Sequence, residues 1–97
     1  MTAEYFRNIN VDNLNNTGTI SVKLTPNPST GLVTIEVDEG IPSCVNVYDI
    51  RGNRCYSDKY PGSNRFSLDL SSFNTGTYFV ELLFDHGVIV KKLLLYY

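Results

Sequence analysis

The sequence lacks tryptophan and has only two cysteines and one histidine among its 97 residues. Two cysteines cannot form the disulfide framework of a small secreted scaffold, and one histidine adds too little for a typical zinc site. Charged residues make up only 19% of the chain, and the net charge is −2. An acidic chain is a poor electrostatic partner for nucleic acid or anionic membranes. No apolar run approaches the ~20 residues of a membrane span.

The first residues also lack the features of a signal peptide, because no basic region precedes an apolar one. We therefore expect either a cytoplasmic protein or a fragment of a longer one. Residues 1–18 are polar and rich in asparagine, which favours local side-chain bonding over regular structure. They are predicted to be a linker or loosely attached arm that precedes one folded domain, residues 19–97. Phe6 and Ile9 are apolar residues through which this arm can dock.

From residue 19 onward, apolar and polar residues alternate with the period of half-buried strands. No segment shows a convincing helical period. Glycine-, proline- and asparagine-rich turns separate the alternating segments, which are 20–24, 33–37, 45–47, a short return strand containing Cys55, 66–70, 78–84 and 88–97. The sequence therefore predicts an all-β, immunoglobulin-like antiparallel β-sandwich of about seven strands.

The link between the first two strands contains Pro26 and Pro28, which have no N–H to give to a sheet. Because a proline also pushes the residue before it towards an extended conformation, residues 25–28 are expected to cross in an extended form. They cannot pair as a central strand. Gly31 then closes a turn in which a positive φ is expected.

The middle hairpin is predicted to turn at Arg51-Gly52, which places Tyr48 opposite Cys55. Cys44 then lies opposite Lys59, four residues from Cys55 and roughly 13 Å away at ~3.4 Å per residue. This exceeds the reach of a disulfide. Both thiols are therefore expected to be free, with Cys55 as a small buried hydrophobe.

The last hairpin is predicted to turn at His86-Gly87, which places Glu81 opposite Lys92. Its inward face is apolar except for Lys91, which is predicted to lie opposite Leu82. Its outward face is also unusually apolar for a sandwich surface. We predict that this outward side, together with the two lysines, recognises a partner through Phe79, Glu81, Leu83, Val90, Lys91, Lys92 and Leu94. The alternative is that residues 1–18 cover this side through Phe6 or Ile9, or that a second copy of the domain covers it.

No combination of residues predicts catalysis, a metal site or a cofactor site. His86 lies in a turn, Asp38-Glu39 lacks the spacing of a calcium loop, and Asp49 is best explained as a cap of turn amides. One alternative to a recognition domain is a stand-alone adhesion or carbohydrate-binding module. It would use tyrosines as a stacking surface: Tyr48, Tyr56, Tyr60, Tyr96 and Tyr97.

Four ordered motifs cover about residues 20–95 and together resemble the C-terminal sorting domain of the type IX secretion system. The first is Pro26-Asn27-Pro28-x-x-Gly31, and the second runs from Val45 through Tyr48-Asp49 and Gly52 to Arg54. The third is Leu68-Asp69-Leu70-Ser71-Ser72-Phe73-x-x-Gly76-Thr77-Tyr78-Phe79-Val80, and the fourth is Gly87 followed by Lys91-Lys92-Leu93-Leu94-Leu95. One departure is the end of the chain, which lacks the basic residue that often closes the family's last strand.

This resemblance implies a non-catalytic address carried by secreted proteins of Bacteroidetes-type bacteria. It implies a cargo domain before residue 1, passage through the periplasm, and delivery to the outer-membrane surface or the medium. The implied partners are the type IX secretion machinery and a sortase-like surface peptidase that removes the domain. No cofactor is implied.

Overall fold

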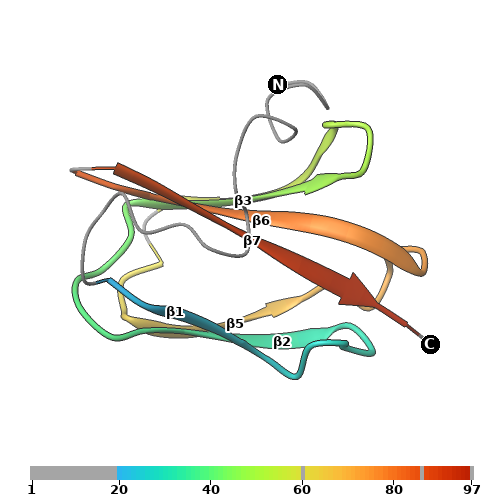
Figure 1. Cartoon of the computed structure of the whole chain (residues 1–97), viewed down its shortest axis with the longest axis horizontal. Coiled ribbons are helices and arrows are strands. Elements are labelled where there is room, and N and C mark those ends of the chain that lie inside the picture. The colour runs from blue at the N-terminus through green and yellow to red at the C-terminus, as the bar shows by residue number, and fades with distance from the viewer. Residues whose placement is uncertain (1–19, 60, 86, 97) are drawn as a thin grey trace.

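A computed structural model describes residues 20–59, 61–85 and 87–96. The expected arm, residues 1–18, lies outside the described residues. Within the described ranges, seven antiparallel strands in two packed sheets confirm the predicted all-β architecture (Figure 1). The strands are β1 (Val22–Thr25), β2 (Leu32–Val37), β3 (Cys44–Asp49), β4 (Arg54–Lys59), β5 (Arg65–Asp69), β6 (Gly76–Phe84) and β7 (Gly87–Leu95).

The two sheets have different widths. One has the order β1-β2-β5 and the other the order β4-β3-β6-β7. Figure 1 shows them as two layers, with β1, β2 and β5 in the lower one. Alternate residues of each strand point into the space between the layers, where Val33, Ile35, Val47, Leu82 and Leu93 have no exposed surface. Burial of such side chains stabilises a sandwich by roughly 25 cal/mol per Å² of apolar surface.

The link between β1 and β2 also runs beside β7, which was not predicted. The side chain of Asn27 donates from Nδ2 to the carbonyl of Lys92 at 3.0 Å and accepts at Oδ1 from the N–H of Leu94 at 3.1 Å. One residue beyond Pro28, the N–H of Ser29 donates to the carbonyl of Leu94, and its carbonyl accepts from Tyr96. The peptide bonds before both prolines are cis. The segment therefore links two strands, as expected, and also covers part of the edge of a third.

Gly31 has a φ of 129°, which confirms the positive φ expected at the end of this link. Its carbonyl accepts a hydrogen bond from the N–H of Leu70 at 2.7 Å. This contact holds the turn against the residues that follow β5.

The turn of the middle hairpin was predicted one residue too short. Residues 50–52 form the loop, because the N–H of Asp49 donates to the carbonyl of Asn53. Gly52 has a φ of 88°, as a three-residue hairpin loop requires. Cys44 does pair with Lys59, but a bulge between Val47 and Tyr48 puts Tyr48 opposite Arg54. Cys55 is exposed instead of buried, because alternation along β4 turns its neighbour Tyr56 towards the core. Both cysteines are free, as predicted.

The register of the last hairpin was wrong by two residues. Phe84 pairs with Gly87, so residues 85–86 form the loop, and Glu81 lies opposite Val90 instead of Lys92. Lys91 lies opposite Val80 instead of Leu82. A shift by two leaves every side chain on its predicted face, since the period of a strand is two residues.

Candidate recognition surface

The predicted recognition residues lie on β6 and β7, and most share one face of the larger sheet. We call the side turned away from the smaller sheet the outer face. Alternation along the strands puts six predicted residues there: Phe79, Glu81, Leu83, Val90, Lys92 and Leu94. On this face Phe79 lies opposite Lys92, and Leu94 lies opposite Thr77 on the neighbouring strand. Lys91 is the exception, because its partner Val80 faces the core.

Exposure varies strongly across this outer face. Val90 and Glu81 are buried, with exposed fractions of 0% and 3%. Phe79 and Leu83 are half-buried, whereas Lys92 is exposed and Leu94 has an exposed fraction of 39%. The part of the face most accessible to a partner is therefore its end near Lys92 and Leu94.

Glu81 is held by two residues of β3 that sequence reasoning did not single out as a group. The side-chain amide of Asn46 donates to Glu81 Oε1 at 3.1 Å, and the hydroxyl of Tyr48 donates to the same oxygen at 3.2 Å. All three side chains are buried. The sequence does show that Asn46 and Tyr48 alternate with Val45 and Val47, which places both on the outer face. It does not show that β3 lies beside β6, and without that neighbour Glu81 cannot be identified as their partner. This group of hydrogen bonds fixes the two central strands to each other on the outer face.

Two motif residues, Asp49 and Gly52, shape the loop of the middle hairpin. Asp49 Oδ1 accepts from the N–H groups of Arg51 and Asn53, both at 2.9 Å, which confirms its predicted capping role. Burial raises the pKa of Asp49, but the hydrogen bonds from Asn53 and Arg51 outweigh it and lower the pKa below 3.8. The ionised carboxylate is thus the form that the folded loop favours.

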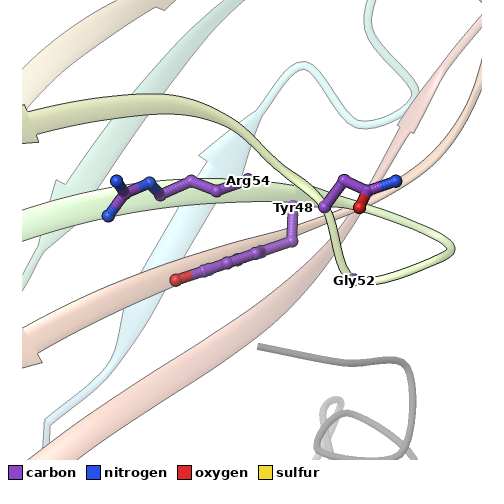
Figure 2. A pocket seen from close by; sticks show the side chains of 4 residues that line it. Tyr48, Gly52 and Arg54 are labelled. Atoms are coloured by element: carbon purple, nitrogen blue, oxygen red, sulfur yellow. The ribbon is translucent and has the colours of Figure 1, made fainter.

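A shallow hollow of 470 Å³ lies beside this loop and is lined by Tyr48, Gly52, Asn53 and Arg54. Figure 2 shows the Tyr48 and Arg54 side chains directed the same way, away from the loop at Gly52. The second motif, from Val45 to Arg54, therefore forms the loop of the middle hairpin and the ends of β3 and β4 that adjoin it.

The remaining motif residues lie at the ends of the last hairpin. Tyr78 donates its hydroxyl to the carbonyl of Asn74 at 2.8 Å, and its ring packs against Phe73 with centroids 5.7 Å apart. Gly76 pairs with Leu95, and Gly87 begins β7. Tyr78 thus ties the turn before β6 to the core.

The tyrosines considered for carbohydrate stacking do not form one row in the part of the chain that the structure describes. Tyr48 is buried and bonded to Glu81, whereas Tyr56 packs against the core. Tyr96 has an exposed fraction of 67%. Tyr60 and Tyr97 lie outside the described residues.

No group of three or more histidine, cysteine, aspartate or glutamate side chains that could hold a metal ion occurs within residues 20–59, 61–85 and 87–96. Over those same residues, the structure contains no helix with the length and apolar character needed to cross a membrane.

Comparison with known proteins identifies the domain. A search of curated proteins finds no match. The family model of the secretion system C-terminal sorting domain matches residues 23–96, which include all seven strands except the first residue of β1. That family is a non-catalytic signal of the Por, or type IX, secretion system. The chain therefore belongs to the family of secretion system C-terminal sorting domains.

Proposed function

We propose that the outer face of β6 and β7 is the surface by which the secretion machinery recognises this domain. A sorting domain implies a secreted or cell-surface cargo and contact with the machinery. The cargo would precede residue 1 and cross the periplasm with the domain. A sortase-like peptidase would then separate the two at the cell surface.

The observation that carries this proposal is the apolar character of a sheet face that the second sheet does not cover. Leu94 is a large apolar side chain with an exposed fraction of 39%, and Phe79 and Leu83 are half-buried on the same face. Covering such groups by a partner contributes roughly 25 cal/mol per Å². Glu81 and Val90 are buried, so they would support this face from within while the more exposed residues make the contact.

Charge on the face would guide orientation more than affinity. Lys92 is exposed and lies opposite Phe79, so it adds a positive charge beside the apolar groups. Charged groups at the rim of an interface mainly control the association rate and the orientation of the partner. Lys91 faces the other way at the edge strand and would contribute less than Lys92.

The test uses the domain fused behind a secreted reporter in a bacterium that has this secretion system. The changes Phe79→Ser and Leu94→Ser together should leave the reporter in the periplasm. A matched control changes two exposed apolar residues elsewhere, Leu32→Ser and Ile50→Ser, whose exposed fractions are 61% and 60%. Circular dichroism and thermal melting establish that both variants fold.

Normal surface delivery of a well-folded Phe79→Ser/Leu94→Ser variant would show that the machinery reads another surface. Failure of the unmodified fusion to leave the periplasm would instead show that the domain does not act as an export signal.

A further inference from the structure

A hollow of 320 Å³ lies where the β1–β2 link meets the last strand. Its lining residues are Asn27, Pro28, Thr77, Lys92 and Leu94. These residues come from the β1–β2 link and from the last hairpin. Asn27 and Lys92, for example, are 65 positions apart in the sequence. The hollow is therefore a feature of the folded domain, and the last strand alone does not form it.

Hydrogen bonds hold the two sides of the hollow together. The amide of Asn27 bonds to the carbonyl of Lys92 and the N–H of Leu94, as the peptide group of a neighbouring strand would. Ser29 adds two backbone bonds, one to Leu94 and one to Tyr96, each 2.8 Å long. These four bonds fix Pro28, which lies between them in sequence, beside β7.

The lining has a distinct chemical character. Leu94 and Pro28 provide exposed apolar surface, and Lys92 is the only charged residue among the lining residues. No carboxylate is among them to neutralise that lysine. An apolar hollow beside a single positive charge complements an apolar side chain that has a carboxylate next to it.

We propose that this hollow receives an apolar side chain of the secretion machinery, flanked by an acidic residue that pairs with Lys92. The proposal rests on the proposed function and specifies the chemistry of the partner at the accessible end of the outer face. Because the lining needs both the link and the last strand, the partner reads the folded domain rather than a linear tail.

The first experiment changes the charge at the hollow in the reporter fusion. Lys92→Glu should slow export by about tenfold, because like charges at an interface are strongly unfavourable. Lys92→Arg should export normally, and Lys92→Gln should fall between the two. The matched control is Lys59→Glu, a charge reversal on β4 at the opposite edge of the same sheet.

The second experiment removes the wall of the hollow. Asn27→Ala deletes both side-chain bonds to β7, and it should also slow export severalfold. Asn74→Ala is the control, because only the backbone carbonyl of Asn74 takes part in its bond with Tyr78. Thermal melting of each purified domain separates loss of recognition from loss of folding.

If a folded Lys92→Glu variant is exported at the normal rate, the acidic partner is wrong. If folded Asn27→Ala is exported normally, the hollow is not part of the recognised surface. In either case the folded Phe79→Ser/Leu94→Ser variant would still stay in the periplasm. Failure of the proposed function is distinguishable because that double variant would then be exported normally.

Discussion

Gly31 lies against Ser71 so closely that a Cβ added to the glycine would be 2.7 Å from the Cα of Ser71. The Cβ and the backbone nitrogen of Ser71 would each be 3.0 Å away. Two constraints coincide at this position, because its φ of 129° is also unfavourable for any residue with a side chain. Glycine at position 31 is therefore required by both space and backbone conformation.

Gly31→Ala should accordingly lower the free energy of unfolding by about 3 kcal/mol, from backbone strain and overpacking together. The control is Gly40→Ala, at a φ of 88°, where the added Cβ has no atom of the described residues within 4 Å apart from those of Gly40 and its two chain neighbours. That control should cost only about 1 kcal/mol, since strain is its sole penalty. Urea unfolding monitored by circular dichroism compares the two. Equal losses would mean that contact with Ser71 is unimportant.

Asp49→Asn should destabilise the domain in a pH-dependent way. The folded state lowers the pKa of Asp49 below 3.8, so the carboxylate stabilises the fold above the unfolded pKa and stops doing so as the pH falls through the folded pKa. The difference in melting temperature between wild type and variant should be constant from about pH 7 to about pH 5 and shrink below about pH 4. A difference that is independent of pH over this range would refute the role of the charge.

Glu81→Ala should destabilise the pairing of β3 with β6. It removes the oxygen that accepts from both Asn46 and Tyr48 in a buried position, which is expected to cost about 1–3 kcal/mol. Tyr48→Phe removes one of these two bonds and should cost less, about 1 kcal/mol. Chemical denaturation of the three proteins gives the order. A more stable Glu81→Ala variant would show that burial of the carboxyl group outweighs its hydrogen bonds.

The two cysteines should each react with an alkylating reagent without prior reduction, giving two adducts by mass spectrometry. Cys55 is exposed as a residue, but its thiol is partly desolvated. That desolvation and then the charge of Asp49 raise the pKa of Cys55 above 9.0, so it should react slowly at neutral pH. Its alkylation rate should rise with pH up to at least about pH 9, since the thiolate is the reactive form. Asp49→Asn should speed the reaction. Unreduced protein that gives no adduct would indicate a Cys44–Cys55 disulfide, which the pairing of Cys44 with Lys59 does not allow.

Local patterns predicted the strands and their faces but not every register. The inward side chains of β6 and β7 were assigned correctly because a period of two survives a shift of two residues. The error came from placing Gly87 in the loop, whereas it pairs with Phe84 as the first residue of β7. In the middle hairpin, the bulge beside Tyr48 changed the register after Val47. Cys55 was expected to be buried, but it is exposed because Tyr56 takes the inward position on β4.

Contacts between segments distant in sequence were the part that local patterns could not supply. The bonds from Asn46 to Glu81 and from Asn27 to β7 depend on which strands become neighbours, and that order is fixed by packing of the whole domain. The resemblance to the sorting family marked Asn27 as a motif residue. Only the three-dimensional arrangement shows that its side chain stands in for a peptide group.

The hydrogen bonds that Asn27 and Ser29 make with β7 can form only after β7 has been synthesised. A chain emerges from synthesis with its N-terminal end first, so the first link waits for partners at residues 92–96 that appear after every other strand. Until then, the wall of the hollow beside Lys92 does not exist. A product truncated before β7 would contain the other six strands but no partners for Asn27 and Ser29. Under the recognition proposed above, the machinery would therefore bind only chains in which the last strand has been made and has paired with the first link.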